Sequence, residues 1–423
     1  MPFDPPRQRP LLLLGLGLVI AIGIFLRLPP AVFESPGAPL HALAWLHPSS
    51  GFNGIGFDES LYRKYVNSVA HTGLGDYPAI VDHYIEVQKT MAGSILPPVR
   101  FLYIFSAYLW HQIFGTEALA ALRDVASFFS ILTLVLSTIF AWRLKGPTFA
   151  LGVAALMSVA PTQVHMSQHA LVDGFFTFWA LLSLWLLWEN LRSPRRWQWL
   201  VPYVVALALL VTTKENSAFV WIALVGLMIG NRWLQFGTVS RELVLATILG
   251  PLLGVVILIF MAGGISTLIE TYRLSVSKNY QLTYAILTGD GPWHRYLVDL
   301  LLVSPVVLLL AIGAAFRLDR TQKPELFLCV FIGASYLIMC NLKYGMNLRY
   351  ANMWDLPLRV LALSQIVHWF GSLGRFRSLL ITLSVLALCA YELRQYYILC
   401  VQYPLYELVT EGLLRALHIL KSP

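Results

Sequence analysis

The sequence places two adjacent carboxylates, Asp58 and Glu59, three residues before an aromatic residue in the stretch Asp58-Glu59-Ser60-Leu61-Tyr62. Carboxylates can remove protons or bind cations, whereas lysine and arginine bind anions. Other residues with such chemistry stand in short polar stretches between apolar runs: Arg100, His165, Asp173, Lys214, Glu215, His294, Arg349 and Tyr350. The elements around these groups decide whether they can act together.

Composition indicates an integral membrane protein. Of 423 residues, 57% are hydrophobic and only 12% are charged, and the mean hydropathy is +0.67. These values lie far outside the range of soluble globular domains. The net charge of +8 comes from scattered basic residues without a basic stripe, so nucleic-acid binding is not expected. The four cysteines stand singly, which argues against a zinc site or a disulfide framework.

Apolar runs of roughly the length that a bilayer requires, about 17 to 25 residues, predict about eleven transmembrane helices, within about ten to thirteen. The expected spans are 11–28, 124–142, 147–163, 173–189, 198–213, 216–231, 243–262, 297–316, 325–341, 353–370 and 378–396. The first of them could instead be a signal peptide, but it has no evident cleavage site. The segment Val99–Phe114 is read as an interfacial or re-entrant helix, because counting it as a span would invert the sidedness of nearly all basic loops.

With the N-terminus inside, every inner connection is basic, as the positive-inside rule requires. The first outer loop then spans 29–123 within a membrane domain of 1–396, and 397–423 is a short amphipathic segment. Asp58, Glu59, Asp173, Lys214 and Arg349 all fall outside. Basic residues are normally depleted from short outer loops, so the simplest reason for Lys214 and Arg349 is an anion held at the membrane surface.

Several stretches resemble one family in the same order along the chain. Besides the acidic pair, they are PPVRFLYIFSAYLWHQIFG, EALAALRDVASFFSILTLVLSTIFAWRL, APTQVHMSQHALVDGFFTFWALL, VTTKENSAF and NLRYANMWDLPL. Together they resemble the GT-C fold glycosyltransferases related to protein O-mannosyltransferases and aminoarabinose transferases, over roughly residues 10 to 360. His169 stands where the family most often has arginine, and Met353 where it has proline. A large soluble domain after the last span, as in oligosaccharyltransferase catalytic subunits, is not expected.

The resemblance implies transfer of a sugar from a polyprenyl-phosphate donor to a hydroxyl of a lipid, glycan or protein, by an inverting displacement at the outer membrane face. Asp58 is then the candidate base, and Glu59 orients it, binds the acceptor or ligates a divalent cation such as Mg, Mn or Zn. Lys214, Arg349 and Tyr350 are candidates for the donor phosphate, because positive charge stabilises the leaving anion. Further site candidates are Tyr62, Arg100, His165, Asp173, Glu215 and His294, the last also as a metal ligand.

Each residue also has a structural interpretation. Asp58 could cap a helix from Glu59 to about His71, and Asp173 could cap the fourth span. Glu59 could pair with Arg63, and Lys214 with Glu215. His165 and His294 could be interfacial histidines, and Arg349 could be a lipid anchor whose charged group reaches the headgroups.

A transporter or flippase is the alternative function, and a non-catalytic assembly partner with the same fold is another. The predicted spans are almost free of charge in their middles and show no repeat, which argues against a transporter. The lack of retrieval signals and the compact size favour a bacterial cytoplasmic membrane, with undecaprenyl phosphate as the lipid, over the endoplasmic reticulum.

Overall fold

A computed structural model describes residues 9–34, 36–47, 56–403 and 405–420. This part of the chain contains helices and no β-strand, in agreement with the all-α prediction. The α-helices are α1 Arg9–Arg27, α2 Ala31–Glu34, α3 Phe57–Thr72, α4 Tyr77–Thr90, α5 Phe101–Phe114, α6 Ala118–Lys145, α7 Pro147–Ser158, α8 Pro161–Gln168, α9 Val172–Arg192, α10 Trp197–Val211, α11 Ser217–Leu234, α12 Arg241–Met261, α13 Ile265–Asn279, α14 Thr283–Thr288, α15 Arg295–Val303, α16 Pro305–Arg317, α17 Lys323–Met339, α18 Asp355–Trp369, α19 Arg377–Tyr396 and α20 Glu411–Ala416.

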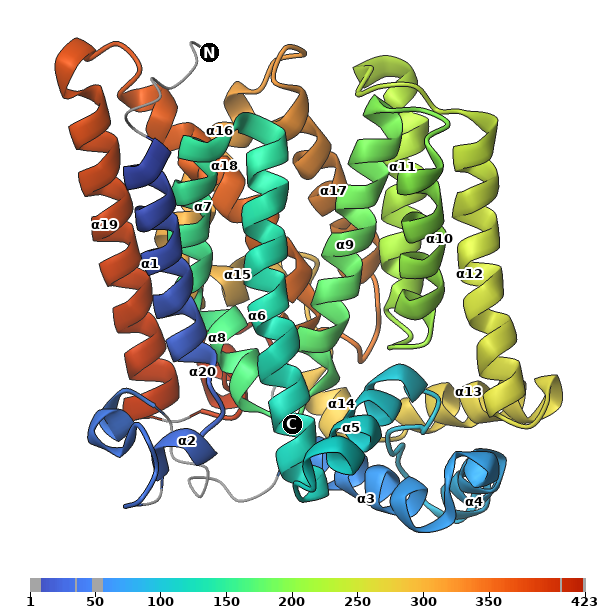
Figure 1. Ribbon diagram of the computed structural model, residues 1–423. Helices are drawn as coiled ribbons and strands as arrows, with labels where there is room; N and C mark the ends of the chain where they lie inside the picture. The colour runs from blue at the N-terminus through green and yellow to red at the C-terminus, as the bar shows by residue number, and fades with distance from the viewer. Residues whose placement is uncertain (1–8, 35, 48–55, 404, 421–423) are drawn as a thin grey trace.

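Long helices run side by side and form one bundle (Figure 1). Each predicted span coincides with a helix or with a broken pair of helices, and most boundaries agree within a few residues. The third span is broken, because α7 and α8 meet at a bend of 54° before Pro161. The eighth span is likewise divided into α15 and α16 at Ser304 and Pro305.

The predicted number of eleven spans is not confirmed. Among the described residues, six helices are long and apolar enough to cross a membrane, and the bent pair α7–α8 would make a seventh. The six segments are Pro10–Arg27, Ala118–Lys145, Val172–Arg192, Ser217–Leu234, Arg241–Met261 and Gly374–Gln402. Helices α10 and α16 are apolar but shorter. Several segments that the sequence predicted as complete spans are therefore broken or short helices in the structure.

At one end of the bundle, helices lie across it instead of along it. Figure 1 shows α3, α4, α5 and α13 there, and we call this the interfacial end. Helix α5 corresponds to the segment predicted to be interfacial, and it packs against α3 and α6. Tyr77 Oη donates to the carbonyl of Pro98 at 2.6 Å, which fixes the approach to α5. Helices α3, α4 and α5 belong to the predicted first outer loop, whereas α13 follows the predicted span 243–262.

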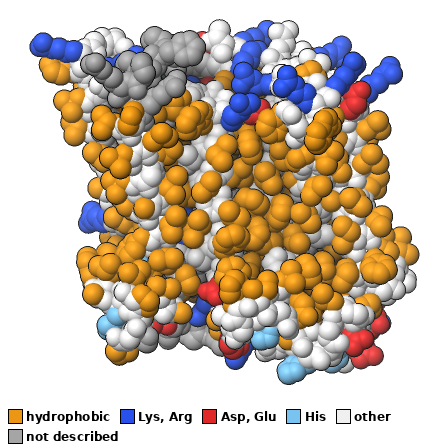
Figure 2. Space-filling view, viewed as in Figure 1, with side chains coloured by type: hydrophobic (Ala, Val, Ile, Leu, Met, Phe, Trp, Pro, Cys, Tyr) orange, Lys and Arg blue, Asp and Glu red, His pale blue; other side chains and the backbone are white. Residues whose placement is uncertain are grey.

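Basic residues gather at the opposite end, which we call the basic end (Figure 2). Helix α6 finishes there with Arg143 and Lys145, and α9 with Arg192. A broad band of hydrophobic side chains covers the face between the two ends. A band of this kind beside a basic rim is what a lipid bilayer selects, and the protein is an integral membrane protein.

The predicted spans are less free of charge than the sequence pattern suggested. Arg359 of α18 is completely buried and pairs with Asp355 at 2.7 Å and with Glu392 of α19 at 2.6 Å. Its Nε also donates to the carbonyl of Leu156 at 3.1 Å. Because every contact of Arg359 joins two helices or two turns of one helix, this network cross-links α7, α18 and α19. A buried ion pair satisfied in this way is a structural feature of the bundle.

Candidate active site

Arg349 lies at the centre of a group of carboxylates at the interfacial end. Its Nη1 is 3.2 Å from Asp58 Oδ2 and 4.0 Å from Asp173 Oδ2, and its Nη2 is 3.3 Å from Glu407 Oε1. Burial alone would lower the pKa of Arg349, but Glu407, Asp58 and Asp173 raise it well above its ordinary value. Segments from four distant parts of the chain therefore meet at one permanently charged guanidinium.

The backbone before Arg349 explains how it is presented. Asn347 is extended, and its side-chain oxygen accepts a hydrogen bond from the Arg349 amide at 2.9 Å. This cap starts a short 3-10 helix, Leu348–Trp354, that leads into α18. Trp354 and Met353 are buried and anchor the turn in the bundle. Arg349 thus projects from a rigid entry into a helix, as the NLRYANMWDLPL stretch suggested.

Lys214 forms the second positive group. Its Nζ lies 2.5 Å from Asp173 Oδ1 and 3.9 Å from the centre of the Tyr350 ring. Helix α10 ends just before Lys214, where the hydroxyls of Thr212 and Thr213 donate hydrogen bonds to the carbonyls of Leu209 and Leu210. The predicted pairing of Lys214 with Glu215 is therefore replaced by pairing with Asp173, and Asp173 is an ion-pair partner instead of the cap of α9.

Arg100 is the third positive group, and Glu215 neutralises it. The Arg100 guanidinium donates to both Glu215 oxygens at 3.1 to 3.4 Å and to the Tyr62 hydroxyl at 2.7 Å. Burial raises the pKa of Tyr62 despite the neighbouring arginine. The Thr212 carbonyl accepts from the Leu102 amide at 3.0 Å, which ties the start of α5 to the Lys214 turn. The cluster therefore includes most of the residues that the sequence singled out.

Glu59 points away from Arg349 and holds the backbone. Its side chain is 1% exposed, and its oxygens accept from the amides of Gly56 at 3.0 Å and Ala170 at 2.7 Å. Burial favours the neutral acid, but His169, Arg123 and the Ala170 amide lower the pKa of Glu59 to about 2. The predicted Glu59–Arg63 pair is wrong, because Arg63 binds Glu117 at 2.6 Å. Glu59 fixes the start of α3 against the turn before α9.

Asp58 does not cap α3. The helix begins at Phe57 with Gly56 as its cap residue, so the Asp58 side chain is free to reach Arg349. Its side chain is 24% exposed, whereas Asp173 is 4% exposed and Glu59 1%. The fourth predicted carboxylate, Glu215, is 32% exposed but is engaged by Arg100, so among the predicted carboxylates Asp58 is the accessible one beside Arg349.

The two predicted histidines lie outside this cluster. His165 Nε2 donates to the carbonyl of Tyr406 at 3.0 Å, and its ring lies 4.5 Å from the ring of His169. His294 precedes α15 and packs edge to face with Trp293, at 5.4 Å between ring centres. His165 therefore binds residues 405–420, which we call the C-terminal segment. His294 does not contact the group around Arg349 among the described residues.

Sequence reasoning missed Glu407 and the role of the segment around it. Residues 405–411 pack back onto the interfacial end, where the Tyr406 ring lies 5.1 Å from that of His169. A methyl group on Gly56 would come within 2.4 Å of the Tyr406 ring, so a glycine is needed at this crossing. Glu407 stands in no motif, and only its position after the last span could have drawn attention to it.

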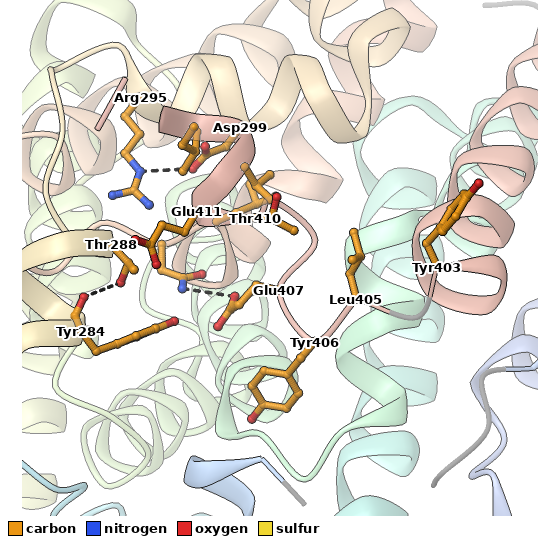
Figure 3. A pocket seen from close by; sticks show the side chains of 14 residues that line it. Tyr284, Thr288, Arg295, Asp299, Tyr403, Leu405, Tyr406, Glu407, Thr410 and Glu411 are labelled. Carbon is orange, nitrogen blue, oxygen red and sulfur yellow. Dashed lines mark hydrogen bonds and ion pairs between the residues drawn. The ribbon is translucent and has the colours of Figure 1, made fainter. Parts of the chain in front are cut away.

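Beside Arg349 the C-terminal segment walls a pocket of about 480 Å³ (Figure 3). Its lining comprises Tyr284, Thr288, Arg295, Asp299, Asn347, Leu348, Tyr403, Leu405, Tyr406, Glu407, Val409, Thr410, Glu411 and Leu414. Glu407 belongs both to this wall and to the group around Arg349, and its Oε2 accepts from the Asn347 side chain at 3.3 Å.

The predicted metal ligands do not fit a metal ion. Glu59 is fully engaged with two amides, Arg123 and His169, and His294 lies beside Trp293. Within the described ranges, no three histidine, cysteine, aspartate or glutamate side chains gather in a way that could hold a metal ion. The geometry instead pairs the basic groups Arg349, Lys214 and Arg100 with the carboxylates of Asp58, Asp173, Glu407 and Glu215.

Known proteins resemble the chain in sequence over part of its length and in fold over most of it. Residues 83–288, just under half of the chain, match the family described as dolichyl-phosphate-mannose-protein mannosyltransferase. No curated protein sequence matches. Two solved structures are similar at 14% identity. Apo ArnT from Cupriavidus metallidurans has a TM-score of 0.55, with 93% of this chain and 76% of that chain covered. The oligosaccharyltransferase AglB from Archaeoglobus fulgidus, with an inhibitory peptide and a dolichol-phosphate, has a TM-score of 0.59, covering 95% and 57%.

The protein therefore has the fold of the GT-C class of membrane glycosyltransferases. Within that class, it resembles the protein mannosyltransferases in sequence over 83–288 and ArnT and AglB in fold. The chain spans little more than half the length of the archaeal oligosaccharyltransferase chains that it matches.

Proposed function

We propose that the protein transfers a sugar from a polyprenyl-phosphate donor to an acceptor hydroxyl at the interfacial end, and that this end faces the outside of a bacterial cytoplasmic membrane. The observation that carries the proposal is the meeting of Arg349, Lys214 and the accessible Asp58 in one cluster at this end. The ArnT structure solved with undecaprenyl phosphate and the AglB structure solved with dolichol-phosphate support a lipid-phosphate donor.

The donor phosphate binds to Arg349 and Lys214. Arginine can hold two phosphate oxygens at once, and lysine acts as a point charge. In the structure, carboxylates already pair with both basic side chains. Glu407, Asp58 and Asp173 surround Arg349, and Asp173 pairs with Lys214. A phosphate therefore competes with a carboxylate. The phosphate displaces Glu407 from Arg349, because Glu407 lies on the irregular C-terminal segment whereas Asp58 and Asp173 lie on helices.

Asp58 removes the proton from the acceptor hydroxyl. A phosphate leaves as a stable anion, so the reaction needs a base at the acceptor more than an acid at the leaving group. Glu59 holds the first turn of α3 in place and so positions Asp58. Tyr350 supports Lys214, and Arg100 with Glu215 and Tyr62 braces the start of α5.

An archaeal oligosaccharyltransferase of the same fold was solved with Zn and sulfate, so a divalent cation is a partner to test. Glu59 and His294 are not suited to hold one in this chain, for the reasons of geometry given above. Related AglB structures carry peptides, so a protein acceptor is one of the acceptors to test beside lipids and glycans.

The test is consumption of a defined donor. Purified protein in vesicles is given a panel of undecaprenyl-phosphate sugars and, separately, nucleotide sugars. We expect one or more lipid-phosphate donors to be consumed with release of undecaprenyl phosphate. Consumption of nucleotide sugars alone would contradict the proposed donor class.

Lys214 makes donor binding depend on pH. Burial lowers the pKa of Lys214 to about 8, with Arg100 and Arg349 adding to the effect and Asp173 opposing it. The amine is therefore protonated at neutral pH and loses its charge as the pH rises through about 8. We expect affinity for undecaprenyl phosphate to fall several-fold, roughly the loss of one charged hydrogen bond, between pH 7 and pH 9.

The measurement is the dissociation constant of undecaprenyl phosphate at both pH values. The matched control is Lys214→Met, which has no titrating group at this position. It should bind more weakly at pH 7 and lose no further affinity at pH 9. An equal loss in both proteins would assign the pH dependence to another group.

A further inference from the structure

The pocket beside Arg349 contains a buried pair whose hydrogen bonds are incomplete. Arg295 and Asp299 stand one turn apart on α15, with 5% and 1% of their side chains exposed, and their closest charged atoms are 3.8 Å apart. Arg295 Nε and Asp299 Oδ1 have no hydrogen-bond partner among the described residues. Both side chains line the pocket (Figure 3). Buried polar atoms of this kind normally have partners, and the pocket that both side chains line provides the space for one.

The other lining groups indicate what that ligand is. Thr288 and Thr410 carry hydroxyls, Asn347 an amide, and Glu407 and Glu411 carboxylates. Tyr284 adds an aromatic ring that is 53% exposed. Hydroxyl groups both donate and accept hydrogen bonds, so a surface with carboxylates, a guanidinium and an amide suits a ligand rich in hydroxyls. The volume of about 480 Å³ lies within the range of small-molecule sites.

The position of the pocket relates it to the phosphate site. One oxygen of Glu407 contacts Arg349 at 3.3 Å, and the other accepts from Asn347, which lines the pocket. In a lipid-phosphate donor the sugar is bonded directly to the phosphate. A phosphate held by Arg349 would therefore carry its sugar next to Glu407, where the pocket begins.

We propose that this pocket binds the monosaccharide of the donor, with Asp299 and Arg295 contacting its hydroxyl groups and the C-terminal segment forming its wall. The inference rests on the proposed function, because the pocket is assigned through the phosphate at Arg349. Sugar selectivity would then reside largely in 403–414, a stretch that contributes eight of the fourteen lining residues.

The experiment compares two lipids that differ only in the sugar. Dissociation constants are measured for bare undecaprenyl phosphate and for undecaprenyl-phosphate mannose, the sugar named by the matching family. The variants are Asp299→Asn, which keeps the size of a buried side chain, and Tyr284→Ala, at an exposed position that does not support the core. Asp319→Asn, in the exposed connection after α16, is the control.

The wild type should bind the mannose-bearing lipid more tightly than the bare lipid. Asp299→Asn should weaken binding of the mannose-bearing lipid by about tenfold, the scale of a lost charged hydrogen bond, and leave the bare lipid unchanged. Tyr284→Ala should act in the same direction, and Asp319→Asn should leave both constants unchanged.

Three results would overturn the assignment. Equal affinity of the wild type for the bare lipid and for every undecaprenyl-phosphate sugar of the donor panel would mean that no sugar is recognised. Unchanged donor binding in Asp299→Asn and Tyr284→Ala together with slower transfer would assign the pocket to the acceptor. Failure of the wild type to bind even the bare lipid would instead remove the proposed function itself, and the two failures are therefore distinguishable.

Discussion

Asp58→Asn should leave a folded protein that binds its donor and transfers sugar about 100-fold more slowly or worse, the usual scale of a lost general base. Asparagine has nearly the same size and can still accept a hydrogen bond from Arg349. It cannot take a proton from a hydroxyl at neutral pH. Because Asp58 is not the cap of α3, the substitution should not weaken the helix.

The measurement is the transfer rate at saturating donor, together with the melting temperature in detergent. Asp82→Asn, on the exposed face of α4, provides the same chemical change without the proposed role. Near-normal transfer by Asp58→Asn would remove Asp58 from the mechanism. The next candidate would then be Glu407, whose side chain is 23% exposed, because Asp173 and His165 are buried.

Arg349→Ala should weaken binding of undecaprenyl phosphate by about 10- to 100-fold, corresponding to a charge-assisted bond of roughly 1.5 to 3 kcal/mol. The substitution also leaves three carboxylates without their arginine, and their repulsion of an anion adds to the loss. Binding is measured directly with the bare lipid, so a defect in chemistry does not enter the result.

Arg63→Ala is the matched control, since Arg63 is an arginine on α3 that pairs with Glu117 at the surface. It should bind the lipid as the wild type does. Glu407→Gln should shift binding the other way, because the competing carboxylate has lost its charge. Unchanged affinity in Arg349→Ala would leave Arg349 as a structural residue that holds the C-terminal segment.

Apolar run lengths predicted the bundle well, because a bilayer imposes both composition and helix length on the sequence. The positions of the helices followed from this pattern, but their continuity did not. The break between α7 and α8 occurs at Pro161 within an apolar stretch, and hydropathy alone does not register a bend. The short helices α10 and α16 were likewise read as complete spans.

The sequence predicted which residues form the candidate site better than it predicted which of them pair with one another. Asp58, Asp173, Lys214 and Arg349 were all expected on one side, and they do meet. Which carboxylate faces which cation depends on side-chain directions at helix ends, so Glu59 proved to bind backbone amides and Lys214 to bind Asp173. Glu407 could not be placed, because contacts between residues about 60 to 350 positions apart leave no local pattern.

We propose that the cluster of Arg349, Lys214 and Asp58 breaks the bond between a sugar and a lipid phosphate. The main alternative is a protein that moves such a lipid across the membrane without breaking this bond. The most direct measurement follows a donor labelled in its sugar, placed in one leaflet of vesicles that contain the purified protein and an acceptor. We expect release of one undecaprenyl phosphate for each sugar found on an acceptor hydroxyl, with the anomeric configuration inverted. Intact donor that appears in the opposite leaflet, without any transfer, would contradict it.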